Sequence, residues 1–257
     1  MTHGGLNFPR PDAPSLVHEK VLALLLNEKP GLLLDVPTGE GAFAAKAREL
    51  GHEVICGDLD VSRFNVPSLQ CDQVDLNARW PYSNAQFDYV VSIEAIEHLE
   101  NPWHMAREAN RVLKMGGRFL LTTPNVLSIR SRFSYLLYGY PNYFYYMIEQ
   151  SPCCSEERPV DHINPIGFLE LRHILSRTGL HIEAIESNRL LKQRSVFFQL
   201  IRLLLLTRGR SHVRNHEAKA SVRRALLSTA LLFGEVLVLK ARKVHDPNAW
   251  IHSKESQ

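Results

Sequence analysis

The chain has 257 residues, of which 45% are hydrophobic, so it can bury a full core and is most simply one domain, residues 1–257, with insertions. The first residues contain no apolar run, and we therefore expect no secretory signal. The four cysteines lack C-x-x-C spacing, which argues against a disulfide framework or a cysteine zinc site and predicts a reducing compartment. The net charge is +3, but the charges are unevenly distributed: residues 189–224 form a basic segment with ten Lys or Arg and one acidic residue.

In chain order, residues 15–29 predict an amphipathic helix, and the stretch LLLDVPTGEG, residues 32–41, predicts a buried strand, a turn and the start of a second helix. Asp35 would end the strand, at the edge where open α/β sheets bind ligands. Gly39 and Gly41 in the turn would let a ligand approach the backbone at a helix N-terminus. The dinucleotide fingerprint has three glycines and this turn has two, so a tight turn without a ligand remains an alternative.

The stretch HEVICGD predicts a second strand that ends at Asp58. An acidic residue about 20 positions after a glycine turn suits a carboxylate that accepts both hydroxyls of a ribose, which favours a nucleoside ligand. The segment QVDLN, residues 73–77, predicts a short strand tip. Asp75 could accept a hydrogen bond from the exocyclic amine of a base, and an ordinary turn or N-cap aspartate fits the spacing equally well.

The following segments continue the alternation of strands and helices. Residues 87–94 predict a buried strand, and residues 101–117 predict a helix that Gly116 and Gly117 stop. The remaining predicted elements are a strand at 118–125, a helix at 163–179, a strand at 181–187 and a final strand at 234–243. This order indicates a parallel, doubly wound α/β sheet.

With these motifs in order, the chain resembles the class I S-adenosylmethionine-dependent methyltransferases over roughly residues 15–187 and the final strand. LDVPTGEG is similar to the first motif of that family and GDLD to its ribose-binding acid. VDLN is similar to its adenine-contacting segment, and LKMGGRFLLTTPN to the passage before the substrate-binding elements. One departure is Pro37, which stands where the family usually has glycine.

The resemblance implies S-adenosyl-L-methionine as the cofactor and a mostly parallel, seven-stranded Rossmann-like sheet whose last strand is antiparallel. It also implies a lid over the acceptor site after the fifth strand, at residues 125–160. We expect a basic amphipathic helical insertion at residues 189–224, before the last strand. The residues expected at the cofactor are Asp35, Thr38, Gly39 and Gly41 at its methionine part, Asp58 at the ribose, and Asp75 with Leu76 at the adenine.

The residues best placed for chemistry lie in the stretch SIEAIEHL. Glu94, Glu97 and His98 would end the fourth strand and project toward the methyl donor. Methyl transfer from a sulfonium needs mainly proximity, but an alcohol is a weak nucleophile at neutral pH. A hydroxyl acceptor therefore needs a base or a metal ion.

The E-x-x-E-H pattern, followed much later by His162, is similar to the metal site of small-RNA terminal 2′-O-methyltransferases and to the same segment of ubiquinone-pathway O-methyltransferases. That resemblance implies that Glu94, Glu97, His98 and His162 hold a divalent ion (Mg, Mn, Fe or Co), which lowers the pKa of the acceptor hydroxyl. Equally, His98 could act as a general base without a metal, with His162 as a second base. A structural role for these residues is the third alternative. The catalytic candidates are Glu94, His98 and His162.

Two further segments bear on the acceptor. The tyrosine-rich segment SYLLYGYPNYFYYM could stack on a sugar or ring, but aromatic residues at helical spacing usually pack together, so we expect a lid core. The basic segment combines one apolar helical face with arginines: Phe197, Leu200, Ile201, Leu204 and Leu205, with Arg202, Arg208, Arg210 and Arg214. An interfacial helix on anionic lipid and a cap packed on the sheet fit this pattern equally well, and no run is long enough to span a bilayer.

These features predict an S-adenosylmethionine-dependent O-methyltransferase that acts on a small molecule, a glycan or a lipid-linked intermediate. An RNA 2′-O-methyltransferase, which would bind phosphates with the basic segment, remains an alternative, although we do not expect a nucleic-acid partner. A non-catalytic nucleotide-binding module and a nicotinamide oxidoreductase also remain, but the oxidoreductase would give SIEAIEHL no role. We expect a cytoplasmic protein, at the inner face of the membrane if the basic segment binds lipid.

Overall fold

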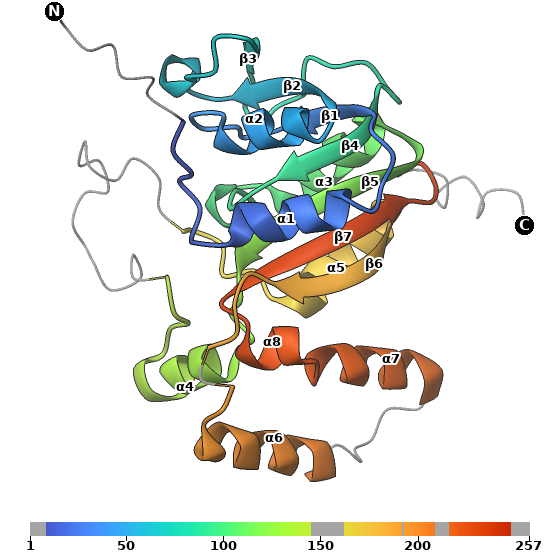
Figure 1. The fold of residues 1–257 in the computed structure, drawn as a ribbon. Coiled ribbons are helices and arrows are strands. Elements are labelled where there is room, and N and C mark those ends of the chain that lie inside the picture. Colours follow the sequence, from blue (N-terminus) through green and yellow to red (C-terminus); the bar gives the residue numbers. More distant parts are fainter. Residues whose placement is uncertain (1–8, 145–161, 192, 209–215, 248–257) are drawn as a thin grey trace, which may run out of the picture.

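The computed structural model describes residues 9–144, 162–191, 193–208 and 216–247 (Figure 1). Their strands form one seven-stranded sheet in the order β3-β2-β1-β4-β5-β7-β6. The strands are β1 (Leu32–Asp35), β2 (Glu53–Asp58), β3 (Cys71–Gln73), β4 (Phe87–Ser92), β5 (Leu113–Pro124), β6 (Leu180–Ser187) and β7 (Val236–Lys243). The sheet is parallel from β3 to β5, and β7 runs antiparallel between β5 and β6.

The strand order reverses between β1 and β4. The chain moves outward from β1 through β2 to β3 and then returns to place β4 on the other side of β1. Such a reversal leaves a crevice beyond the carboxyl ends of the two strands, where open α/β sheets bind their ligands. Asp35 ends β1 and Ser92 ends β4, so the polar segments that follow both strands lie at this crevice.

Helices cover both faces of the sheet (Figure 1). On one face, α1 (Val17–Leu25) and α2 (Ala42–Glu49) bury residues such as Val21 and Phe43 against β1 and β4. On the other face, α3 (Pro102–Val112) and α5 (Phe168–Arg177) bury residues such as Met105 and Leu171. The side of each helix that packs on the sheet is apolar because its hydrophobic residues lie three or four positions apart in the sequence.

Four more helices lie at one end of the sheet, below β6 and β7 in Figure 1. The first, α4 (Ile129–Tyr138), follows β5, and the others precede β7: α6 (Val196–Arg208), α7 (His216–Leu226) and α8 (Thr229–Phe233). Asn125 connects this group to the sheet, since its side-chain amide donates to the carbonyls of Ala230, Leu231 and Gly234. In the part of the chain that the structure describes, none of the helices has the length and apolar character that crossing a membrane requires.

Two predicted boundaries are wrong. The short strand expected at residues 73–77 ends at Gln73, because only Cys71, Asp72 and Gln73 pair with β2. The helix expected to continue to Gly117 ends at Val112, and the next residues already belong to β5. Leu113 pairs with Phe87 of β4, so strand pairing prevails over the local helical pattern.

Candidate active site

The turn after β1 is held together by its own polar side chains. Asp35 is 1% exposed, and the Thr38 hydroxyl donates a hydrogen bond of 2.7 Å to its Oδ2. Burial raises the pKa of the Asp35 carboxyl to about 7, although the Thr38 hydroxyl opposes that shift. Asp35 and Thr38 thus lie together at the crevice, as expected, and they also stabilise the turn itself.

The two glycines of the turn have φ values that other residues rarely adopt, +55° at Gly39 and +90° at Gly41. A Cβ on Gly41 would lie 2.5 Å from Val66 and 2.6 Å from Phe64. A Cβ on Gly39 would lie 3.2 Å from Asp12. The close neighbours of these glycines in the structure are therefore side chains of this chain, and their contact with a cofactor stays a prediction.

Asp58 ends β2 beside this turn. Its Oδ2 accepts from the backbone N–H of Gly39 at 2.8 Å, and its Oδ1 accepts from the N–H of Asp60 at 3.0 Å. A carboxylate has about four lone-pair positions, so these two bonds leave acceptor capacity for ribose hydroxyls. Asp58 therefore links the second strand to the glycine turn and remains compatible with its expected role.

Asp75 and Leu76 follow β3 in a turn. Asp75 is exposed, and its Oδ1 accepts from the N–H of Asn77 at 2.8 Å, as a turn-forming aspartate does. Leu76 is buried in the main core. Any contact of Leu76 with an adenine would therefore use its backbone, and the adenine role of both residues stays a prediction.

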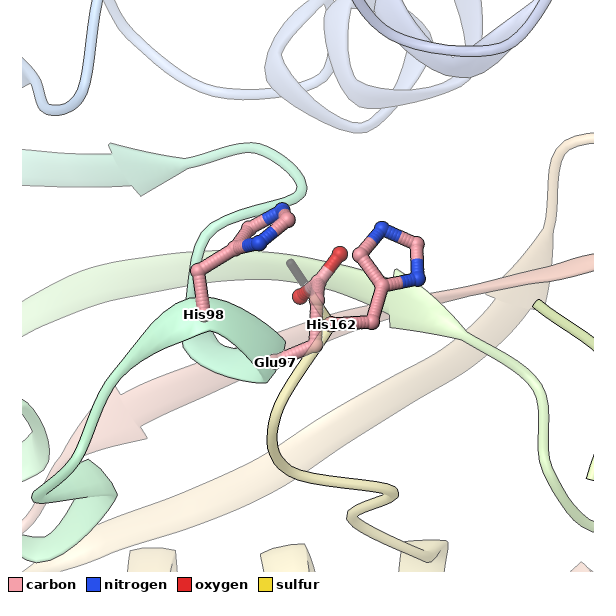
Figure 2. Close-up of side chains that lie close together, drawn as sticks. All are labelled: Glu97, His98 and His162. Atoms are coloured by element: carbon pink, nitrogen blue, oxygen red, sulfur yellow. The ribbon is translucent and has the colours of Figure 1, made fainter. Parts of the chain in front are cut away.

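After β4, the structure brings together three of the four expected metal ligands. One ligand atom from each of Glu97, His98 and His162 lies within 4.8 Å of the others. Glu97 and His98 belong to a short 3-10 turn, Ile96–His98, and His162 comes from the segment before α5. Figure 2 shows the Glu97 carboxylate between the two imidazole rings, whose centroids are 4.6 Å apart.

Glu97 is the buried member of this group. It is 0% exposed, its Oε2 accepts from the Thr123 hydroxyl at 3.0 Å, and its Oε1 has no hydrogen-bond partner among the described residues. Burial, with the nearby Glu94 carboxyl as a second cause, raises the pKa of Glu97 well above its ordinary value. A buried carboxylate oxygen without a donor needs a proton or a cation, so Glu97, His98 and His162 fit a divalent ion.

His162 is oriented by the backbone. Its Nδ1 lies 2.9 Å from the carbonyl oxygen of Tyr143, so this nitrogen must carry the proton of the hydrogen bond. A neutral His162 then has its lone pair on Nε2, which is how metal-binding histidines are commonly fixed. Phe144 packs against the same ring, with centroids 5.3 Å apart.

Glu94 lies outside the three-residue group. The Thr122 hydroxyl donates to its Oε1 at 2.8 Å, and its backbone N–H donates to the Thr122 hydroxyl oxygen at 2.9 Å. Burial raises the pKa of Glu94 to about 7, with Glu235 as a further, like-charged cause. The backbone φ of Glu94 is +47°, a strained value for glutamate that ordered surroundings must maintain.

Several site residues escaped the sequence analysis. Thr122 and Thr123, both buried at the end of β5, each bond one glutamate. Their signal was present, because two adjacent polar residues follow the apolar run FLL near the end of the strand. Tyr143 and Glu235 carried no such signal, since they are far apart in sequence.

Tyr143 and Glu235 form a second network beside the site. The Tyr143 hydroxyl donates to Glu235 Oε1 at 2.7 Å, and the Arg189 guanidinium binds both Glu235 oxygens. The Arg189 hydrogen bonds hold the pKa of Glu235 down to about 2 despite its burial. Arg189, the first cation of the basic segment, thus has its charge paired.

The tyrosines expected to form a lid core do not all do so. Tyr135 and Tyr138 are exposed on α4, so that expectation is wrong for these two residues. Residues 145–160 of the expected lid lie outside the described residues, as do Arg210 and Arg214 of the basic segment.

Known proteins resemble this chain in sequence and in fold. A family model described as a methyltransferase domain matches residues 11–185. The 27-O-demethylrifamycin SV methyltransferase of Amycolatopsis mediterranei is 27% identical over 121 residues, which cover 43% of this chain and 44% of that protein. A ubiquinone biosynthesis O-methyltransferase of Ruegeria pomeroyi is 29% identical over 101 residues, which cover 36% and 41%. The matched part thus spans less than half the length of either relative.

Solved structures agree in fold over most of the chain. A methyltransferase from Archaeoglobus fulgidus that depends on S-adenosylmethionine superposes with a TM-score of 0.55 and 20% identity, covering 88% of this chain and 94% of that one. Another from Mesorhizobium loti has a TM-score of 0.52 and 18% identity, covering 87% and 96%. At such identities the likeness shows the fold alone.

Proposed function

Because the chain belongs to the class I S-adenosylmethionine-dependent methyltransferases, whose cofactor is S-adenosyl-L-methionine, we propose that it transfers the cofactor's methyl group to a hydroxyl of its acceptor. The observation that carries this proposal is the Glu97, His98 and His162 group. It lies after β4, at the crevice where the strand order reverses and where the glycine turn after β1 would hold the cofactor.

The cofactor is held by the first turn and its neighbours. Asp35, Thr38 and the backbone of the turn would hold the methionine part, and Asp58 would accept hydrogen bonds from the ribose hydroxyls. Asp75 and the backbone of Leu76 would lie at the adenine. The cofactor would supply a methyl group on a sulfonium, and the residues after β4 would position the acceptor oxygen for its transfer.

The acceptor hydroxyl is activated by the group of Glu97, His98 and His162. A divalent ion bound there would supply Lewis-acid chemistry and lower the pKa of the hydroxyl. Two imidazoles and one carboxylate suit Fe²⁺, Mn²⁺ or Co²⁺. Glu94 lies outside this group of three. With a pKa of about 7, it is suited to accept the proton that the hydroxyl loses as the O–CH₃ bond forms and the S–CH₃ bond of the cofactor breaks, which leaves S-adenosylhomocysteine.

The names of the relatives support a class of acceptor. The two curated relatives named above are methyltransferases for a rifamycin precursor and for ubiquinone biosynthesis, respectively. Both names support an O-methyltransferase for a small molecule or a lipid-linked intermediate, and a glycan remains compatible with the site. Incubation of the purified protein with a labelled methyl donor and a cell extract would identify the acceptor as the molecule that becomes labelled.

Chelation tests the metal. We expect a chelator to abolish methyl transfer and to leave S-adenosylhomocysteine affinity unchanged, because the ion acts on the acceptor rather than on the sulfonium. Added Mn²⁺, Fe²⁺, Co²⁺ or Mg²⁺ should restore transfer to different extents. Glu97→Gln and His162→Ala should each resemble the chelated enzyme.

His181→Ala serves as the matched control, because this histidine is exposed on β6, away from the group. Full activity in chelator would instead support His98 as a metal-free base, with activity that rises with pH as the imidazole loses its proton. Full activity of His98→Ala would contradict both versions of the proposal.

A further inference from the structure

Two helices beside the candidate site expose apolar residues to solvent. On α4, four consecutive residues are exposed: Tyr135, Leu136, Leu137 and Tyr138, with Leu136 at 76%. On α6, Phe197, Leu200 and Leu203 are exposed. A folded monomer rarely leaves a contiguous set of large apolar side chains in water, and such a set indicates a binding surface.

The two sets belong to one surface. Phe133 of α4 and Phe197 of α6 lie with ring centroids 5.7 Å apart, which makes the helices neighbours (Figure 1). Their inner sides pack on Leu232 and Phe233 of α8, through residues that include Ile129, Phe198 and Ile201. Each helix therefore has apolar residues that pack on α8 and further apolar residues that stay exposed to solvent. We call the exposed apolar residues of the two helices, Tyr135–Tyr138 on α4 and Phe197, Leu200 and Leu203 on α6, the α4–α6 surface.

The sequence predicted one apolar face on this segment, and Phe197, Leu200, Ile201 and Leu204 of α6 do share a face, because they lie three or four positions apart. Only part of that face packs on the protein: Ile201 is partly buried, whereas Phe197, Leu200 and Leu204 are exposed. A cap packed on the sheet would bury its apolar face. The exposed part of the face is therefore not explained by packing against the sheet.

Charge identifies the kind of partner. The sequence has no acidic residue from 109 to 148 or from 187 to 216, so α4 and α6 both lie in acid-free stretches. Arg130 and Arg194 are exposed at the beginnings of the two helices. Two copies of this cationic surface would repel each other, whereas anionic lipid offers both negative headgroups and an apolar layer. With 13 residues, α6 is about 20 Å long, too short to cross a bilayer and suited to lie along it.

We propose that the α4–α6 surface docks on an anionic membrane, with its leucines and aromatic rings in the apolar layer and its arginines at the lipid headgroups.

The surface leads directly to the candidate acceptor site. Five residues after Tyr138, Tyr143 accepts a hydrogen bond from His162, and Phe144 packs on the same imidazole. Docking would therefore place the site next to the lipid surface. Resting on the proposed function, this placement means that the acceptor hydroxyl is carried by a molecule dissolved in, or anchored to, the membrane.

Vesicle co-sedimentation of the full chain tests the surface without any methyl transfer. We expect binding to vesicles of phosphatidylcholine with phosphatidylglycerol, little binding to phosphatidylcholine alone, and release as salt approaches 1 M, where charge interactions are screened within about 3 Å. Leu136→Asp with Leu200→Asp should lower the partition coefficient at least about ten-fold, because two apolar anchors become like charges. Arg194→Glu should lower it about five-fold.

Matched controls exist elsewhere on the molecule. The first control is Leu26→Asp with Met115→Asp, which changes two large apolar residues that are 65% and 61% exposed on other elements. The second control is Arg107→Glu, which changes an exposed arginine on α3. Both controls should bind vesicles like the wild type. Equal loss in variants and controls, or no binding of the wild type to anionic vesicles, would overturn the proposal. So would a dimer that the Leu136→Asp and Leu200→Asp pair dissociates, since the surface would then belong to a second copy.

Calorimetry with S-adenosylhomocysteine on the same preparations separates this inference from the proposed function. Cofactor binding without vesicle binding rejects the surface alone. Vesicle binding without cofactor binding supports the surface and rejects the methyltransferase proposal.

Discussion

At the scale of single residues, Glu235 shows how one carboxylate joins parts of the chain that are distant in sequence. It receives hydrogen bonds from Tyr143, Asn188 and Arg189, and its own backbone carbonyl accepts from the N–H of Asn125. The carboxylate is buried, so each of these donors compensates for lost hydration. Tyr143 in turn orients His162, which makes Glu235 an indirect support of the candidate site.

Glu235→Gln should therefore destabilise the protein at neutral pH. The folded pKa is about 2 and the ordinary value is 4.5, so the ionised carboxylate contributes its full stability above pH 4.5. That contribution is lost as the pH falls toward 2. Because Arg189 is about half exposed, we expect a loss of only about 1–2 kcal/mol at pH 7.

Urea unfolding of the wild type and the variant at pH 7 and near pH 3 measures this effect, and the difference between them should shrink at the lower pH. Glu19→Gln is the control, since Glu19 pairs with Lys46 on the exposed surface and should change stability by less than about 0.5 kcal/mol. A difference for Glu235→Gln that grows on acidification would contradict the assignment.

At the scale of elements, the turn between β1 and α2 constrains both the fold and the site. Gly41 caps the N-terminus of α2 with a φ of +90°, and the loop after β2 places Phe64 and Val66 where a Cβ on residue 41 would lie. The glycine turn and that loop therefore fit together only because residue 41 has no Cβ.

Gly41→Ala should destabilise the protein by about 2–4 kcal/mol, since it adds backbone strain and forces Phe64 and Val66 aside. Gly116→Ala measures the cost of the backbone strain without the cost of the crowding. Gly116 has a similar φ of +79° but nothing within 4 Å of its Cβ position, so its cost should be about 1 kcal/mol. Thermal unfolding compares the two, and equal costs would show that packing against the loop is unimportant.

The elements also show what local sequence can predict. Strands β1, β2, β4, β6 and β7 lie where their apolar runs and flanking glycines predict them. β3 is misplaced because a three-residue edge strand has too little pattern of its own and depends on its pairing with β2. Leu113 joins β5 for a similar reason, since its partner on β4 lies 26 positions away.

The candidate site, too, could be predicted only in part from local sequence. Glu97, His98 and His162 were predicted as a group from a motif and one distant histidine, and they do lie together. The same prediction included Glu94, which lies outside this group and accepts a hydrogen bond from Thr122, so its role as a ligand stays a prediction. Thr122, Tyr143 and the exposure of Leu136 depend on how elements pack, and a single sequence does not contain that information.

At the scale of the whole molecule, cofactor binding should be visible as stability. A ligand that binds only the folded state stabilises it by about 2.7 kcal/mol at 100 times its dissociation constant. For a chain of this size we expect S-adenosylhomocysteine to raise the melting temperature by roughly 5–10 °C. Asp58→Ala should reduce that rise, because the ribose loses its acceptor.

Differential scanning fluorimetry measures the shift, and Asp72→Ala is a suitable control on the neighbouring strand β3. The absence of any shift in the wild type would contradict the cofactor assignment. A full shift in Asp58→Ala would leave the cofactor in place but remove Asp58 from the ribose.

The position of β7 has a consequence for how the protein is made. Among the residues that the structure describes, β6 pairs only with β7, β5 pairs with β7 along seven residues, and β7 is the last strand in sequence. A nascent chain leaving the ribosome therefore carries β5 with one open edge, and β6 with no partner at all, until residue 243 has emerged. Open edges recruit other strands, so this interval is when the chain depends most on chaperones. A premature stop before Val236 would accordingly yield an aggregate rather than a shorter folded protein.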